Sequence, residues 1–258
     1  MVEGLVSIIM PSWNTARFIA ESIQCVINQT YQNWELIIVD DCSTDNTDEM
    51  VAHFLTDNRI KYFHNEKNSG AAITRNNAMR KAQGEWIAFL DSDDLWLPEK
   101  LEKQIQFMKQ GGIVLSYTEY EKIDEDGNPL NIYVSAPPII DKHKMYRYDY
   151  IGQLTMMYSA KHFGLIQIKD IKKNNDYAIR LQLYKKPDTK AYLLQENLAK
   201  YRVRKNSISH DKLSKKLKSH YDLFHVCDEK STAVALWYAC WNMWFGLLKK
   251  KKYETHNK

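Results

Sequence analysis

Residues 84–94 read GEWIAFLDSDD, a short apolar run followed by three carboxylates within four positions. The apolar run is too short for a helix and is bounded by Gly84 and by charged residues, so it predicts a buried strand. Three neighbouring carboxylates repel one another, and a bound cation would relieve that repulsion. The acidic stretch is therefore expected at the carboxyl end of a strand, either as a cation site or as a solvated turn in which Asp94 caps the next helix.

Strand and helix signals alternate through the first 120 residues. Apolar runs of strand length occupy residues 6–10, 36–39, 60–63, 86–90 and 113–117. Helical spacing or capping residues mark the segments between them, at 16–29, 43–55, 70–83 and 98–109. This alternation predicts an α/β fold with a Rossmann-like, mostly parallel central sheet flanked by helices, and Pro11 is expected to end the first strand. Ligands of such sheets bind at the carboxyl ends of strands, where Asp40 and Asp41 are expected beside the acidic stretch.

The composition is that of an ordinary globular protein. Of the 258 residues, 44% are apolar and 26% are charged, which excludes a disordered chain and a small disulfide scaffold. The four cysteines lack zinc-like spacing, and no secretory segment or run of 18 apolar residues is present. We expect a cytoplasmic protein with free thiols, either soluble or peripheral on the inner face of the cytoplasmic membrane.

Charge is distributed unevenly along the chain. Residues 1–100 hold 15 acidic and 8 basic residues, a net charge of −7, and residues 101–258 hold 17 acidic and 28 basic residues, a net charge of +11. The asymmetry indicates an acidic site early in the chain and a basic surface later, although the basic half could equally be a solvated face. No nucleic acid is expected as a partner.

The sequence patterns that predict strands and helices become weaker after residue 118. Residues 124–129 (DEDGNP) predict a hairpin turn, without the ligand spacing of a calcium loop. Further helices are expected at 176–184, 209–226 and 231–248 and a strand at 190–194, whereas 141–170 carries no clear pattern.

Four blocks of the first hundred residues resemble glycosyltransferase family 2. They read VSIIMPSWN at 6–14, NQTYQNWELIIVDDCSTD at 28–45, NSGAAITRN at 68–76 and GEWIAFLDSDD at 84–94. NDY at 175–177 and LAKYRVRKNSIS at 198–209 resemble later blocks of polysaccharide and lipooligosaccharide enzymes of the family. Two positions depart from the pattern, since Cys42 replaces the usual Gly and Asn175 replaces a frequent Glu. A Gln-x-x-Arg-Trp motif is absent, which disfavours a processive synthase.

The resemblance implies a GT-A fold and a non-processive, inverting hexosyltransferase. The implied donor is a nucleotide-diphosphate sugar, most commonly a UDP-sugar, used with Mn²⁺ or Mg²⁺. The implied acceptor is a hydroxyl of a glycan or lipid-linked molecule in cell-surface polysaccharide biosynthesis. Residues 1–208 would form the GT-A domain, with a nucleotide-sugar half at 1–118 and an acceptor half at 119–208, followed by a basic, aromatic helical extension at 209–258.

The resemblance also assigns roles to individual residues. Asp93 would be the main metal ligand, with Asp91 contacting the metal shell or the ribose beside Ser92. Asp176 is the candidate general base, unless it only caps a helix. The remaining donor-binding residues are Pro11, Asn14 and Asp40 around the nucleobase and ribose, with Asp41 in support, and Arg75 at the nucleotide or diphosphate. For Arg75 the competing interpretation is a surface salt bridge.

Two other classes of function stay open at this point. A glycoside hydrolase could use paired carboxylates without nucleotide or metal. A nucleotide-sugar-binding protein without turnover is suggested by Asn175 alone.

The last predicted helix carries apolar side chains on one face and is followed by lysines. Val234, Trp237, Trp241, Trp244 and Leu248 repeat at helical spacing, Tyr238 and Phe245 widen the face, and 249–252 are all lysine. Further lysines stand upstream at 212, 215, 216 and 218. Tryptophan and lysine favour an anionic membrane interface, so residues 210–252 are a candidate anchor. Packing on the core or a homodimer contact would explain the same pattern.

Overall fold

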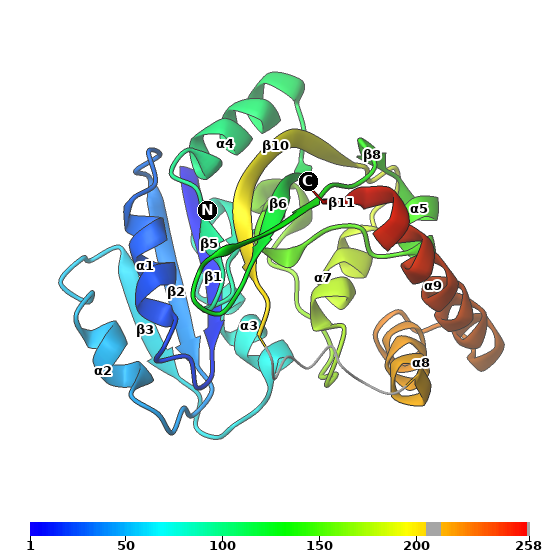
Figure 1. The fold of residues 1–258 in the computed structure, drawn as a ribbon, viewed down its shortest axis with the longest axis horizontal. Helices are drawn as coiled ribbons and strands as arrows, with labels where there is room; N and C mark the ends of the chain where they lie inside the picture. Colours follow the sequence, from blue (N-terminus) through cyan, green and yellow to red (C-terminus); the bar gives the residue numbers. More distant parts are fainter. Residues whose placement is uncertain (205–212, 257–258) are drawn as a thin grey trace.

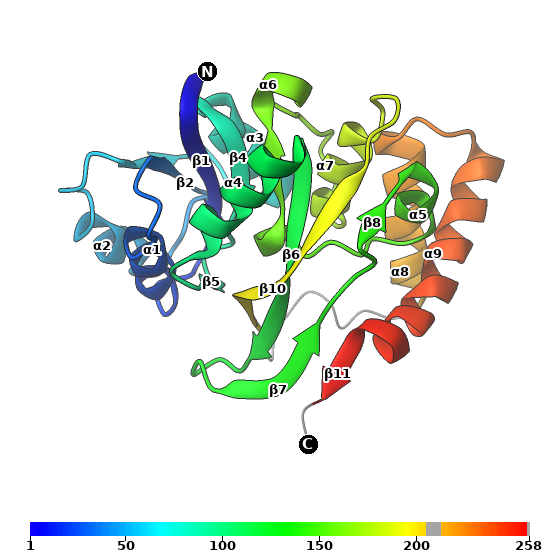
Figure 2. The same ribbon diagram turned by 90° about the horizontal axis from the view of Figure 1, so that it is seen from above.

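The computed structural model describes residues 1–204 and 213–256, with the backbone but not the side chains of 247–251 and 256. Its strands form one mixed sheet with helices on both faces (Figures 1 and 2). The parallel part of the sheet consists, in spatial order, of β3 (Ile60–His64), β2 (Trp34–Asp40), β1 (Val2–Ser12) and β4 (Gly84–Phe89). The sheet continues through antiparallel pairs to β9 (Met157–Ser159), β6 (Leu115–Ile123), β7 (Pro129–Val134) and β11 (Glu254–His256).

A long strand, β10 (Ala191–Arg202), lies near the middle of the molecule. It runs parallel to β6 and also pairs with two short strands, β5 (Leu95–Trp96) and β8 (Ile139–Ile140). In Figure 1 it is the curved yellow strand beside β6, between the N-terminal and C-terminal parts of the chain. Its far end brings Arg202 close to the residues that follow β4.

The alternation of side chains along the strands creates two apolar cores, one on each face of the sheet. Ile8, Ile38 and Ala88 lie on one face, under α1 (Ile19–Ile27), α2 (Thr47–Ala52) and α4 (Lys100–Gly111). Ile9 and Ile37 lie on the other, under α3 (Ala71–Arg80), α5 (Lys142–Arg147), α6 (Ala160–Phe163) and α7 (Asn175–Leu183). All of these strand side chains are fully buried, and each such isoleucine contributes about 1.5–3 kcal/mol of transfer free energy.

Over the described residues, the order of strands and helices expected from the sequence is confirmed with some boundaries changed, whereas residues 209–212 of the helix expected at 209–226 lie outside the described ranges. Pro11 does not end β1, because it pairs with Val39 and the strand continues to Ser12. The pairing of β1 with β4 stops at Ile9, so the missing N–H of Pro11 leaves no partner on that side unsatisfied. The unpatterned segment 141–170 contains α5, a 3₁₀ turn (Gln153–Thr155), β9 and α6.

The C-terminal segment packs as part of the same body. It forms α8 (Leu213–Asp222), a π-helical turn (Leu223–Cys227) and α9 (Thr232–Tyr253), and the pair α8–α9 stands at one end of the molecule (Figure 1). Phe224 and Ala235 join the apolar core that contains Ile9, and β11 adds to the sheet beside β7. The segment expected as an appended extension is therefore integrated in the fold. Within the described ranges, no helix has the length and apolarity needed to span a membrane.

Candidate active site

A cleft of about 900 Å³ opens at the carboxyl ends of β1, β2 and β4. Its walls come from residues 11–13 at the end of β1, 91–94 after β4 and 172–176 at the start of α7. The rest of the lining comes from Thr15, Asp41, Tyr148, the segment 68–75 at the start of α3, the end of β10 and residues of α8 and α9. The topology therefore gathers the acidic stretch, the start of α7 and the C-terminal helices around one volume.

In the acidic stretch Asp94 is buried, Asp91 and Asp93 are partly buried, and arginines form ion pairs with these two. Asp93 forms an ion pair with Arg204 at 2.9 Å (Oδ2 to Nε), and Asp94 accepts a hydrogen bond from the backbone N–H of Arg202 at 2.9 Å. Burial raises the pKa of Asp93, with Asp91 adding to the rise and Arg204 opposing it. Burial and the charges of Asp93 and Asp91 likewise raise the pKa of Asp94 well above its ordinary value. The cluster is therefore electrostatically costly, and positive charge stabilises it.

Arg75 links three parts of the cleft. Its guanidinium donates to Asp91 Oδ1 at 2.5 Å and to the side-chain oxygen of Asn175 at the start of α7. The side chain is only 7% exposed, which rules out the surface salt bridge considered from sequence. Its Nε is buried without a hydrogen-bond partner among the described residues. Arg75 thus has one unused donor in a wall of the cleft, where an anionic ligand could accept it.

Asp176 lies in the first turn of α7, not at its N-cap position, which Asn174 occupies. Its Oδ2 is 3.2 Å from Nη2 of Arg180, a fully buried arginine that also pairs with Asp149. Desolvation raises the pKa of Asp176, but the charges of Arg180 and Arg75 outweigh it and the net pKa is lowered. Asp176 is therefore an ionised carboxylate at neutral pH, held in a wall of the cleft and able to accept a proton.

The residues proposed for the nucleobase and ribose divide into two groups. Pro11 lines the cleft, and so does Asp41, whose carboxylate accepts the N–H groups of Ser69 and Gly70 at 2.8 and 2.7 Å. Asp40 and Asn14 are not among the described residues that line it. The oxygens of Asp40 instead accept hydrogen bonds from the N–H and hydroxyl of Ser43, and the side-chain oxygen of Asn14 accepts the N–H of Thr44. The sequence prediction named Pro11, Asn14 and Asp40 for this subsite with Asp41 in support, and of these four residues Pro11 and Asp41 line the cleft.

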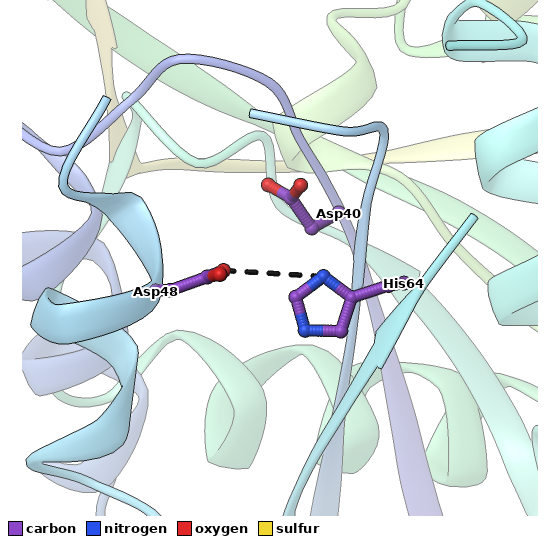
Figure 3. A group of neighbouring side chains, drawn as sticks. All are labelled: Asp40, Asp48 and His64. Atoms are coloured by element: carbon purple, nitrogen blue, oxygen red, sulfur yellow. Dashed lines mark ion pairs between the residues drawn. The ribbon is translucent and has the colours of Figure 1, made fainter. Parts of the chain in front are cut away.

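A second carboxylate group lies outside the cleft. Ligand atoms of Asp40, Asp48 and His64 fall within 4.8 Å of one another (Figure 3). Hydrogen bonds already explain their positions, because Asp40 accepts from Ser43 and Asp48 accepts from the Tyr62 hydroxyl. The contact between Asp48 and His64 is long, at 3.9 Å. We assign no metal to this group.

Sequence reasoning assigned no role to several residues of the cleft. Arg202 donates through Nε to the carbonyl of Asp93 at 2.8 Å, and Arg204 pairs with the Asp93 carboxylate. Their spacing of two residues within the block YRVR was the available signal, because alternate residues of an extended chain share a face. Lys172 also lines the cleft without having been predicted, and so does Lys216 of α8, which the sequence analysis had named only as part of the candidate membrane anchor.

Solved structures with the same architecture identify the fold. TarS from Staphylococcus aureus (residues 1–349), solved with UDP-GlcNAc, aligns with a TM-score of 0.70 and 20% identity, covering 89% of this chain and 69% of that TarS fragment. The mannosyltransferase PcManGT from Pyrobaculum calidifontis, solved with GDP-Man and Mn²⁺, aligns with a TM-score of 0.62 and 16% identity, covering 91% of this chain and 72% of PcManGT. The fold is therefore that of the GT-A glycosyltransferases.

Sequence comparison then gives the family. The model of the family described as glycosyl transferase family 2 matches residues 7–174, and the chain belongs to this family of enzymes. TuaG of Bacillus subtilis, named for teichuronic acid biosynthesis, is 42% identical over 211 residues, 81% of this chain and 83% of TuaG. WfgD of Escherichia coli, named a UDP-Glc:α-D-GlcNAc-diphosphoundecaprenol β-1,3-glucosyltransferase, is 40% identical over 223 residues, 86% of each chain.

Proposed function

We propose that this enzyme transfers a hexose, with inversion and with the help of a divalent cation, from a UDP-sugar to a hydroxyl of a lipid-linked or glycan acceptor. The observation that carries the proposal is the meeting, in one cleft, of the acidic stretch 91–94 with an ionised carboxylate on α7. The first group suits a nucleotide diphosphate with its cation, and the second suits proton removal from the acceptor. A glycoside hydrolase would need only the two carboxylates and leaves the arginines of the cleft unexplained.

The donor set suits a hard divalent cation. Asp91 and Asp93 offer carboxylate oxygens only, and desolvation makes the negative charge of Asp93 costly. Mg²⁺ and Mn²⁺ prefer such oxygen ligands and commonly share them with substrate phosphates. Asp93 would be the principal ligand and Asp91 the second, beside Ser92. A cation bound there would neutralise the negative charge that develops on the leaving diphosphate.

The residues around the metal ligands suit the rest of the donor. Arg75 holds a buried Nε–H without a partner among the described residues, and Arg204, two residues past the end of β10, forms an ion pair with Asp93. Guanidinium groups bind phosphate oxygens through paired, charge-assisted hydrogen bonds. We assign the binding of the nucleobase to Pro11 and Asp41, with Asp41 accepting a hydrogen bond from an N–H of the base. Asp40 and Asn14 would stabilise the loop after β2, where they accept hydrogen bonds from Ser43 and Thr44.

Asp176 is the proposed general base. As the acceptor hydroxyl forms its bond to the anomeric carbon, the bond from that carbon to the diphosphate oxygen breaks. The hydroxyl proton passes to the Asp176 carboxylate, and the electron pair leaves with the nucleoside diphosphate. Attack from the face opposite the leaving group inverts the anomeric configuration. Arg180 and Arg75 keep the carboxylate ionised before the reaction, so it is ready to accept the proton.

The names of the relatives support the acceptor class. WfgD is named for a GlcNAc-diphosphoundecaprenol acceptor, and TuaG for teichuronic acid biosynthesis. By this similarity we assign the chain to cell-surface polysaccharide biosynthesis, on the cytoplasmic side of the membrane where nucleotide sugars are available. The acceptor would enter past Lys172 and Lys216, at the side of the cleft lined by α7 and α8.

Release of nucleoside diphosphate tests the proposal. The protein is incubated with a panel of UDP-, GDP- and dTDP-sugars, Mn²⁺ and a GlcNAc-diphospho-lipid acceptor, and free nucleoside diphosphate is measured. Acceptor-dependent release from a UDP-sugar is expected. Release that needs neither acceptor nor metal, or binding of UDP-sugars without any release on a wide acceptor panel, would count against it.

A further inference from the structure

A second cavity of about 490 Å³ lies between α5 and α9, and it shares no lining residue with the cleft. Four basic side chains surround it: Lys142, His143 and Arg147 from α5, and Lys230 from the segment before α9. Trp237 and Trp241 of α9 provide aromatic walls. Among the described residues that line it, none is acidic. The proposed function uses none of these side chains.

The outward face of α9 continues from this cavity. Trp237 and Trp244 are each 62% exposed, and Leu236 is 45% exposed. The opposite face of the helix packs on the core through Ala235 and Ala239, which are fully buried. Exposed tryptophans at the centre of a helix face are unusual, because each ring leaves a large apolar surface in water. The face of α9 that carries Trp237 and Trp244 is therefore not the face that packs on the core.

Two expectations for this helix change in the structure. Tyr238 does not widen the exposed face but packs against Tyr146 and Phe224, with ring centroids 5.1 Å away in each case. Trp241 stacks on Trp237 at 5.4 Å and also contacts Phe245. Leu248 and the lysines at 249–251 fall outside the described side chains, and Lys212 outside the described residues. The exposed apolar surface is therefore defined by Trp237, Trp244 and their neighbours.

The basic groups of the cavity have spare hydrogen-bonding capacity. Arg147 contacts the His143 ring through Nη2, while its Nε is buried without a partner among the described residues. Lys142 lies over the Tyr146 ring at 6.0 Å, and Lys230 pairs with Asp228 at 3.4 Å. Several donors with excess positive charge around a small volume suit a phosphate group, which offers several acceptor oxygens.

We propose that the basic cavity and the outward face of α9, which carries Trp237 and Trp244, together dock the protein onto an anionic phospholipid membrane. A headgroup phosphate would occupy the basic cavity, and Trp237 and Trp244 would enter the interface between headgroups and acyl chains. Tryptophan favours that interface because its ring is apolar and its N–H can stay hydrated. Lysine and arginine near anionic headgroups add electrostatic attraction. Exposed tryptophans also suit a protein interface, but the cations clustered beside them, with no acidic residue among the described lining of the cavity, favour an anionic lipid surface.

Vesicle sedimentation of the full chain tests the proposal. Vesicles of phosphatidylcholine containing about one third phosphatidylglycerol are compared with pure phosphatidylcholine at low and at physiological salt. We expect binding to the anionic vesicles only, weakened by salt. Trp237→Ala with Trp244→Ala should lower the partition coefficient at least ~10-fold, since each ring loses its burial. Lys142→Gln with Arg147→Gln should lower it about 30-fold, or about 2 kcal/mol at about 1 kcal/mol per charge.

Matched controls keep the outcome interpretable. Leu55→Ala removes another exposed apolar side chain, and Lys109→Gln another exposed charge, both far from α9. Both controls should bind as the unmodified protein does, and all variants should retain UDP binding in calorimetry as evidence of folding. The proposal would be overturned if the α5 and α9 variants bound anionic vesicles as well as the unmodified protein does. It would also be overturned if the unmodified protein bound neutral vesicles as well as anionic ones. A dimer that Trp237→Ala with Trp244→Ala dissociates, without vesicle binding by either form, would also overturn it and assign the face to a second copy.

Discussion

Replacing Asp176 by Asn tests the proposed proton acceptor while changing little else. The side chain keeps its size, and its partner Arg180 still pairs with Asp149. Asp176 is 40% exposed, so its own ion pair with Arg180 contributes less than about 1 kcal/mol to folding. Loss of a positioned general base lowers kcat by about 10²–10⁴-fold. We therefore expect a folded variant with donor affinity close to that of the unmodified enzyme and kcat lower by this factor.

The pH dependence gives an independent reading of the same residue. The pKa of Asp176 is lowered in the folded protein, so the carboxylate stays ionised until the pH falls below the ordinary range of aspartate. The acid limb of kcat/KM that reports Asp176 should therefore lie below that range, with activity present above it and lost as the pH falls. The Asn variant should lack this limb.

The assay is continuous release of nucleoside diphosphate at saturating acceptor, with donor affinity measured separately by calorimetry. Asp126→Asn is the matched control, because Asp126 is exposed at the β6–β7 turn and pairs only with the exposed Arg17 among the described residues. It should keep full kcat. A kcat of Asp176→Asn within a few-fold of the unmodified enzyme would refute the assignment of the base.

Three further changes follow from the structure. Asp41→Asn should weaken UDP binding at least ~10-fold in calorimetry, since a hydrogen bond to a charged group is worth about 1.5–3 kcal/mol. Asp40→Asn should leave UDP binding unchanged. Weaker binding by Asp40→Asn with unchanged binding by Asp41→Asn would instead assign the nucleobase to Asp40. Lys100 is fully buried, its Nζ has no hydrogen-bond partner among the residues that the structure describes, and burial lowers its pKa to about 7, so the unfolding free energy should rise from pH 7 to 10.5. Lys100→Met should remove that rise and stabilise the protein by roughly 1–4 kcal/mol at pH 7, as measured by urea unfolding; an unchanged pH profile would contradict this. Cys42 adopts a left-handed backbone (φ 61°), so Cys42→Gly should stabilise the fold by about 0.5 kcal/mol in the same assay, and a loss of stability would show that the strain is absent.

The alternation of strands and helices was predictable because buried strands consist of short runs of apolar residues, which are visible in the sequence. The same logic places Asp91 and Asp93 together, since both follow one strand directly. Asp176 and Arg75 come together through tertiary packing, and only the family resemblance connected them to the site. Cys42 shows the limit of local reasoning in another way, because the loop adopts a positive φ without the glycine expected to permit it.

Other parts of the site could not be derived from local patterns. Asp40 and Asp41 differ by one position at a strand end, and a shift of one residue turns a side chain to the opposite face. The contribution of α8 and α9 to the cleft depends on contacts between segments far apart in sequence. Arg202 and Arg204 reach the acidic stretch because β10 is much longer than its apolar run at 190–194 suggests. Such long-range arrangements are set by the packing of the whole sheet.

Calorimetric titration of UDP tests most directly the claim that this cleft binds a nucleoside diphosphate through a cation on the acidic stretch. The titration is run with Mn²⁺, with a chelator, and with Asp93→Ala, whose fold should persist because removing a buried carboxylate relieves repulsion. We predict binding with Mn²⁺, and its loss both with the chelator and in the Asp93→Ala variant. Binding of UDP by Asp93→Ala with unchanged affinity and unchanged dependence on Mn²⁺ would contradict the account.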